Sequence, residues 1–338
     1  MKVEFLINYD IDMTPAKEKF AVILADLAQQ IGTKPEWIDR VVVADSERFA
    51  EALASFGGTR KYTNTHGLLA VAKTIRMPNT NPVQTSIVFN TSVVGIVMDA
   101  AIKKGWQVES WTVEEQRSFY VLLHELGHCA DHAVRPVITA DGTRRDENGE
   151  RVVDHTLGNL HAYHFSEMYP EIPACVFGGY GYTEEIRALD MAMNNEALRS
   201  MLRELAQLTE STPPSFGAIF KQAMAVFWFI LFQHAKFTGS ALGNAKLPQK
   251  PSGELWDIAA RLPEVAEALN RAEASVVSAW QVYPQIPDTF RKELTECFHD
   301  IAFACGYLLE VRAGADGVWW DRPLLLQTLR LLDPEMAS

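Results

Sequence analysis

The sequence is poor in positive charge relative to negative charge. Its 338 residues include 31 lysines and arginines against 43 aspartates and glutamates, which gives a formal net charge of −12. Nucleic acids and anionic membranes are bound by clustered basic side chains that neutralise phosphate. The charge balance therefore argues against both kinds of partner.

Long apolar runs are lacking as well. The most apolar run, AMAVFWFILF at residues 223–232, is far shorter than the roughly 20 residues that a helix needs to cross a bilayer. It predicts a buried helix. The first residues, MKVEFLINYDIDM, lack the basic and apolar segments of a secretory signal peptide. We expect a cytoplasmic protein without a membrane-spanning segment.

Cysteine is scarce, and its spacing gives neither a disulfide framework nor a CxxC pair. The four cysteines are Cys129, Cys175, Cys297 and Cys305. They indicate buried free thiols in a reducing compartment. Hydrophobic residues make up 48% of the chain, enough for a sizeable core.

The first hundred residues alternate between strand and helix signals, whereas helical patterns dominate after residue 212. This order predicts an α+β protein with a small mixed sheet in a domain of residues 1–212 and a mainly helical region at 213–338. Residues 84–90, QTSIVFN, are one of the predicted strands. The other predicted strands are residues 3–8, 39–45 and 67–76, and the predicted helices are 15–32, 46–58, 92–105 and 183–208.

One long helix is predicted to begin at the sequence TVEE. Thr112 and Glu115 have the spacing of a capping box, and an apolar-periodic stretch follows them. The second half of this helix reads VLLHELGHCADHAV, with histidines at positions 124, 128 and 132. Residues four apart share one face of a helix, so His124 and His128 can direct their imidazoles at a single ion.

These residues fit the chemistry of a hydrolytic zinc site. Glu125 lies about 100° around the helix from His124, where it can reach a water on the ion without binding the ion itself. Zinc lowers the pKa of such a water, and a nearby carboxylate acts as general base. The pattern therefore predicts one Zn²⁺ per chain, with His124 and His128 as ligands and Glu125 as the catalytic base.

Two further residues of this helix are candidates for supporting roles. His132 lies about 12 Å along the helix from His124, too far for both to bind one ion. It is interpreted as a residue beside the site or a substrate contact. Asp131, three residues after His128, is the better candidate for a carboxylate that orients an imidazole.

A catalytic zinc needs a third protein ligand, and the helix at 183–208 offers two glutamates in its first turn. Glu185 shares a face with two alanines that would allow a close approach to the histidines, so we favour it over Glu184. Acidic residues are also common at helix N-termini for electrostatic reasons alone. Rival ligands lie in VVDHTLGNLHAYH, and they are Asp154, His155, His161 and His164.

The two motifs LLHELGHCADH and YGYTEEIRALDMA together resemble the active-site core of glutamate-ligand zinc metallopeptidases (gluzincins), most closely the anthrax lethal factor type. The resemblance covers roughly residues 112–196. It implies a zincin-like fold and a later helix whose Glu185 is the third ligand. In peptidases of this build an edge strand of the sheet pairs with the extended substrate, and residues 84–90 are our candidate for that strand. It also implies a tyrosine that stabilises the oxyanion of the tetrahedral intermediate, for which Tyr180 and Tyr182 both qualify.

The sequence thus predicts a cytoplasmic zinc metalloendopeptidase, a hydrolase that acts on a protein or peptide. Two alternatives stay open. One is a regulatory or sensing protease with a single dedicated protein substrate, gated by the helical C-terminal region. The other is a non-catalytic module that binds a metal or a partner through the same residues.

Overall fold

The computed structural model describes residues 1–8, 12–56, 64–65, 68–69, 71–77, 83–134, 160–177, 184–211, 213, 215–243, 263–285, 288–304, 307–312 and 315–320. The fold is α+β and mostly helical, with one small mixed four-stranded sheet. The chain divides into two compact units. The first comprises Met1–Pro136, Ser166–Arg187 and Gly239–Leu247, and the second Val137–Phe165, Ala188–Thr238 and Pro248–Ser338. The domain boundary predicted near residue 212 stays a prediction.

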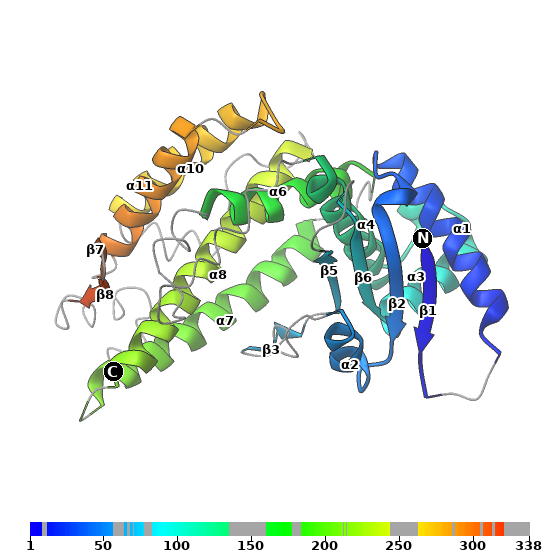
Figure 1. Cartoon of the computed structure of the whole chain (residues 1–338), viewed down its shortest axis with the longest axis horizontal. Coiled ribbons are helices and arrows are strands. Elements are labelled where there is room, and N and C mark those ends of the chain that lie inside the picture. The colour runs from blue at the N-terminus through cyan, green and yellow to red at the C-terminus, as the bar shows by residue number, and fades with distance from the viewer. Residues whose placement is uncertain are drawn as a thin grey trace. The chain divides into compact units, whose positions relative to one another are not determined.

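The four-stranded sheet belongs to the first unit, and its strands run in the order β1-β2-β6-β5 (Figure 1). The first three strands in this order are parallel and β5 is antiparallel to β6. The strands are β1 (Lys2–Leu6), β2 (Ile38–Ala44), β5 (Ala72–Arg76) and β6 (Thr85–Asn90). A separate two-stranded pair consists of β3 (Asn64–Thr65) and β4 (Leu68–Leu69).

The sheet topology corrects one expectation about residues 84–90. These residues form β6, which is paired on both sides and buried at every position. Its backbone groups are occupied by β2 and β5, so β6 cannot accept an extended ligand as an additional strand. Among the described strands, β1 and β5 form the two edges of this sheet, and β5 is the edge strand next to β6.

Alternating side chains of the two central strands build a separate core on each face of the sheet. Val41 and Val43 of β2 point to the face covered by α1 (Thr14–Gln30), α3 (Thr91–Lys104) and α4 (Val113–Val134). Val42 points to the opposite face, where it packs with Phe49 and Leu53 of α2 (Phe49–Ala54). The three-helix face holds α4, so the sheet is the support on which the histidine helix rests.

Short segments join these elements. The 3₁₀ helix η1 (Pro35–Trp37) precedes β2, and η2 (Val108–Ser110) precedes α4. Asn90 ends β6 and caps α3, because its side-chain oxygen accepts a hydrogen bond from the backbone amide of Ser92 at 2.9 Å. Gly105 ends α3 with a φ of 66°, a conformation that favours glycine.

Helix α6 (Leu160–Phe177) is not among the helices predicted from the sequence, and it contains Pro170 and Pro173. Proline removes a backbone donor and clashes with the preceding turn, at a cost of about 3 kcal/mol inside a helix. Helix α6 packs closely on α4, and this packing opposes that cost. A Cβ at Gly127 of α4 would lie only 2.7 Å from the Cα of Pro170, so the glycine allows the two helices to touch through their backbones.

The described part of the second unit is mainly helical, and this unit also includes residues from before position 213. Its helices are most of α7 (Glu184–Glu210) and α8 (Phe216–Gly243), together with α10 (Pro263–Trp280) and α11 (Asp288–Ala304). An antiparallel hairpin, β7 (Tyr307–Arg312) with β8 (Ala315–Trp320), departs from the helical pattern expected there.

Helix α10 packs on α11 through the apolar faces of both helices. Val265, Leu269 and Val276 are buried on α10, and Phe290 and Leu294 are buried on α11. Polar contacts border this interface: Arg271 pairs with Asp300, and the hydroxyl of Ser275 donates to Glu293 at 2.6 Å. The buried residues of both helices recur with the period of about 3.6 residues that is typical of an amphipathic helix.

Helix α8 is also the one described helix that is long and apolar enough to cross a membrane. Residues Gly217–Gly243 have a window of mean hydropathy 1.2, of which 40% is buried inside the protein. Core helices of soluble proteins pass the same test, so length and composition alone are weak evidence for a membrane span.

Candidate metal centre

The histidine helix α4 begins with the predicted capping box. The backbone amide of Thr112 donates to the Glu115 carboxylate at 2.6 Å, and the amide of Glu115 donates to the Thr112 hydroxyl at 3.3 Å. These reciprocal bonds satisfy two amides that a helix start leaves without partners. Leu122, Leu123 and Leu126 are fully buried against the sheet, so one face of α4 is fixed.

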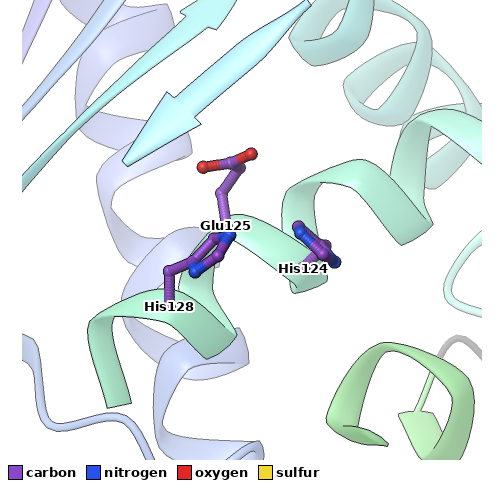
Figure 2. Close-up of side chains that lie close together, drawn as sticks. All are labelled: His124, Glu125 and His128. Atoms are coloured by element: carbon purple, nitrogen blue, oxygen red, sulfur yellow. The ribbon is translucent and has the colours of Figure 1, made fainter. Parts of the chain in front are cut away.

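His124, Glu125 and His128 lie together on α4, as predicted. Their ligand atoms are all within 4.8 Å of one another, and all three side chains are buried. The two imidazole rings meet edge to face with their centroids 4.8 Å apart. Figure 2 shows both rings on successive turns of the helix, with the Glu125 side chain extending from between them.

The carboxylate of Glu125 is held by the sheet. The hydroxyl of Thr74, on β5, donates to Oε2 of Glu125 at 2.7 Å and lies 3.0 Å from the backbone oxygen of the same residue. A second hydrogen bond fixes the backbone of the same turn of α4. The hydroxyl of Thr33 donates to the backbone oxygen of Leu126 at 2.9 Å. The position of Glu125 is therefore set by both α4 and the sheet.

Two glutamates of α6 face the histidines. Oε2 of Glu167 lies 3.8 Å from Nε2 of His124 and 4.0 Å from Nε2 of His128. Two ligands of a tetrahedral zinc stand about 3.4 Å apart, given bonds of about 2.1 Å. The oxygen of Glu167 is therefore only slightly further from each of the two imidazole nitrogens than two ligands of one zinc ion would be.

Glu171, one turn further along α6, approaches the other nitrogen of the same imidazole. Its Oε1 lies 3.1 Å from Nδ1 of His124. Its Oε2 accepts hydrogen bonds from the hydroxyl of Tyr120 and from the hydroxyl of Ser240, the latter at 3.2 Å. Glu171 is completely buried, so this carboxylate is a fixed part of the protein interior.

The electrostatics of this cluster favour a cation. The carboxylates of Glu125 and Glu167 lie close to both imidazoles, and that of Glu171 lies close to His124, in a largely buried region. Carboxylates that share a site repel one another and are costly to bury in their charged form. A divalent cation between the imidazoles would offset this cost and is the largest local charge that such a site can recruit.

The other residues predicted on α4 have different surroundings. Asp131 is fully buried. Burial of Tyr169 on α6, together with the negative charge of Asp131, raises the pKa of Tyr169. Its predicted role of orienting an imidazole stays a prediction. His132 lies one turn beyond His128, and its Nε2 is 3.4 Å from the hydroxyl of Ser166.

Among the alternative ligands predicted from the sequence, His164 contacts another histidine, His234. It is fully buried in the second unit, where its Nε2 lies 2.8 Å from Nδ1 of His234 on α8. Burial holds the pKa of His164 well below its usual range and lowers the pKa of His234 to about 4. Both imidazoles are therefore neutral at pH 7, and one of them donates to the other.

Several predicted site residues lie outside the described part of the structure. Tyr180 and Tyr182 fall there entirely, as do Asp154 and His155. Glu184 and Glu185 begin α7, and His161 lies in the first turn of α6, but the side chains of these three residues are not among those described. The third ligand and the oxyanion tyrosine that the sequence predicts therefore stay predictions.

Sequence reasoning missed the glutamates of α6 and the side chains that support them. Glu167 and Glu171 are four apart, a spacing that places two side chains on one helical face. That signal would have been visible if residues 160–177 had been predicted as a helix. Thr74 and Ser240 carried no local signal, because their contacts with residues 125 and 171 are set by the tertiary fold.

No protein-family model, curated protein or solved structure matches this chain. The functional argument therefore depends on the geometry of the site and on the sequence motif.

Proposed function

We propose that the protein is a zinc-dependent metallopeptidase of zincin-like architecture. The observation that carries the proposal is the approach of three potential donors from two helices. Nε2 of His124 and Nε2 of His128 both lie within 4.0 Å of Oε2 of Glu167, and Glu125 stands next to them on α4. Two histidines and a carboxylate form a common ligand set of catalytic zinc sites, which keep a fourth position open.

Glu167 is the third ligand that we propose. Its carboxylate oxygen already stands at nearly ligand spacing from both imidazoles. Glu185, which the sequence favours, remains the alternative. The two assignments differ in the helix that completes the site, α6 for Glu167 and α7 for Glu185, and a single substitution at each position separates them.

The donor set fits zinc, although two histidines and one carboxylate also suit ferrous iron. The position of Glu125 favours hydrolysis. It follows His124 directly, as a general base does in the His-Glu-x-x-His pattern, and Thr74 holds its carboxylate. Elemental analysis distinguishes zinc from iron directly.

Each residue of the proposed site would have a separate role in peptide hydrolysis. Zinc, when bound, supplies a Lewis acid for the peptide carbonyl and lowers the pKa of water. Glu125 accepts the proton of the attacking water and then delivers it to the leaving amine. The hydroxyl of Thr74 keeps the Glu125 carboxylate in place between these two transfers.

An extended peptide is the substrate shape that the sheet favours. Strand β5 lies at the edge of the described sheet, and its Thr74 contacts the proposed base. An exposed strand edge can bind a peptide through backbone hydrogen bonds. Under this proposal the protein acts on peptides or proteins, with neither nucleic acid nor membrane as partner, and the cytoplasmic location stays a prediction.

Peptide cleavage in a defined mixture tests the proposal. The wild type and Glu125→Gln are incubated with a random peptide library, with and without a chelator, and products are identified by mass spectrometry. We expect cleavage by the wild type that is lost in chelator, restored by zinc and absent in Glu125→Gln, although this variant still binds zinc. Undiminished cleavage by Glu125→Gln would overturn the assigned base. Bound zinc without any cleavage would favour a protease with one dedicated substrate or a non-catalytic metal module.

A further inference from the structure

The two oxygens of Glu171 have different partners, and the difference gives the residue a defined orientation. Oε2 receives both hydroxyl donors, from Tyr120 on α4 and from Ser240 on α8. Oε1 lies 3.1 Å from Nδ1 of His124, close enough for an ion pair although the two atoms are not aligned as a hydrogen bond in this structure. Because two donors from different helices hold the same oxygen, the rotation of the carboxylate is restricted and its other oxygen stays beside the imidazole.

That orientation matters for a histidine that binds a metal. A carboxylate beside Nδ1 stabilises the tautomer that carries its hydrogen on this nitrogen, which leaves Nε2 as the metal ligand. Nε2 of His124 is the nitrogen that faces Glu167. Glu171 therefore stands on the side of the imidazole from which it can orient the ring without competing for the ion.

Ser240 reaches Glu171 because α8 comes into direct backbone contact with α6. A Cβ on Gly239 would overlap the carbonyl oxygen of Met168 and would lie 2.6 Å from Cβ of Glu171. One turn later, a Cβ on Gly243 would lie 2.7 Å from the carbonyl oxygen of Ile172. Both glycines belong to the last two turns of α8, so no larger residue fits there without moving α6.

We propose that residues 239–243 of α8 form a positioning clamp for the metal centre. Ser240, together with Tyr120, fixes the carboxylate of Glu171 against His124, and Gly239 and Gly243 allow the approach of the helices. Ser240 and Glu171 are positioning residues, because neither touches the proposed ion. This inference rests on the proposed metal centre. It assigns to a segment far from the histidine motif in sequence a direct part in metal affinity.

Zinc affinity, measured by competition with a chelator of known affinity, tests the clamp without any need for a substrate. Removing a residue that orients a metal ligand typically lowers affinity about 10- to 100-fold. We expect a loss in this range for Glu171→Ala and a loss of roughly 3- to 30-fold for Ser240→Ala, because Tyr120 still holds the carboxylate. Gly239→Ala should also weaken zinc binding, because the added methyl group must displace α6.

Two control variants are matched to these changes. Ser211→Ala removes a hydroxyl that donates to the backbone oxygen of Leu208 at 2.7 Å, and Gly217→Ala adds a methyl group at the opposite end of α8, where nothing lies within 4 Å. Both should bind zinc as tightly as the wild type. Thermal unfolding in chelator shows whether each variant is folded. If Gly239→Ala does not fold, Ser240→Ala still tests the clamp.

A double-mutant cycle separates positioning from general packing. If Ser240 acts through Glu171, then Ser240→Ala should weaken zinc binding in the wild type and have no further effect in the Glu171→Ala background. Equal losses in both backgrounds, or no loss in the wild type, would overturn the clamp while leaving the metal centre intact. A wild type that binds no zinc would overturn the proposed function and the clamp together.

Discussion

Helices α4 and α6 both bring side chains to the candidate metal centre, but they are specified in different ways. The sequence of α4 itself specifies a helix, through a capping box at Thr112 and Glu115 and an apolar face that packs on the sheet. Helix α6 contains Pro170 and Pro173 and depends on its neighbours for its place. A site can therefore combine one helix that can be predicted from the sequence with another that is found only in the tertiary structure.

The contacts of α6 show how neighbours can compensate for a weak helix. Gly127 of α4 accommodates Pro170, and Gly239 of α8 accommodates the turn that contains Met168 and Glu171. Such backbone contacts give dense packing, which stabilises a helix that prolines would otherwise disfavour. Because α6 also holds two of the glutamates, changes at these glycines should affect the site and not only the stability.

The largest expected effect contrasts two histidines on the same face of α4. His128→Ala removes a proposed ligand, whereas His132→Ala removes a side chain whose described contact is with Ser166. Loss of one ligand should weaken zinc binding on the order of a hundredfold or more, given the total binding free energy of protein zinc sites. His132→Ala should change it less than about threefold. Equal losses in a chelator competition assay would mean that the site extends along the whole histidine row.

Gly127→Ala tests the contact between α4 and α6. The new methyl group would lie 2.7 Å from the Cα of Pro170, so one helix must shift, at a cost of about 1–3 kcal/mol in the free energy of unfolding. Gly95→Ala on α3 is the control, because nothing lies within 4 Å and alanine should stabilise that helix by up to about 1 kcal/mol. Urea unfolding measures both, and a neutral Gly127→Ala would refute the close contact.

Acid should loosen the first turns of α6 through the buried pair of His164 and His234. Burial lowers the pKa of both imidazoles in the folded protein, that of His234 to about 4, whereas an unfolded histidine has a pKa near 6.5. As the pH falls below about 6.5, the unfolded chain takes up protons that the folded protein does not, so stability decreases. The stabilising contribution is fully present above that pH and declines towards pH 4.

The measurement is urea unfolding at pH 7.5 and pH 5, for the wild type and for His234→Gln. We expect the wild type to lose on the order of 1–2 kcal/mol more than the variant between the two pH values. His299→Gln on α11 serves as the control and should follow the wild type. An identical pH dependence in the wild type and His234→Gln would exclude the buried pair as the cause.

The smallest expected effect on stability concerns the capping box at the start of α4, which was predicted from the sequence. Thr112→Ala removes one half of the capping box and should cost about 1 kcal/mol of stability. Zinc affinity should not change, because the box lies at the opposite end of the helix from the histidines. Glu114→Ala, a change in the same turn outside the box, should cost less, and a larger loss than in Thr112→Ala would contradict the capping assignment.

Local patterns were enough to predict most elements of the first unit. The helix at 15–32, the strand at 39–45 and the capped histidine helix appear as α1, β2 and α4 with small shifts at their ends. In each of these cases hydrophobic period and cap chemistry agree. The prediction that His124, Glu125 and His128 would lie together followed from helical geometry alone, and the structure has them within 4.8 Å of one another.

Features that depend on distant segments were not predictable in the same way. Strand order is one: residues 84–90 were expected at an edge, but pairing with β2 and β5 places them in the middle of the sheet. The strands β7 and β8 were missed within a region of helical patterns. Helix α6, which contains two prolines, was not predicted, so Glu167 and Glu171 were not candidates for the site.

The most direct test of the central claim is the zinc content per chain of three natively purified proteins: the wild type, Glu167→Ala and Glu185→Ala. If α4 and α6 together form the metal centre, the wild type and Glu185→Ala will each contain one zinc per chain, and Glu167→Ala will contain almost none. Zinc retained in Glu167→Ala and lost in Glu185→Ala would contradict the account and assign the third ligand to α7. Absence of zinc from all three after reconstitution would leave residues 121–134 as a polar helix without a metal.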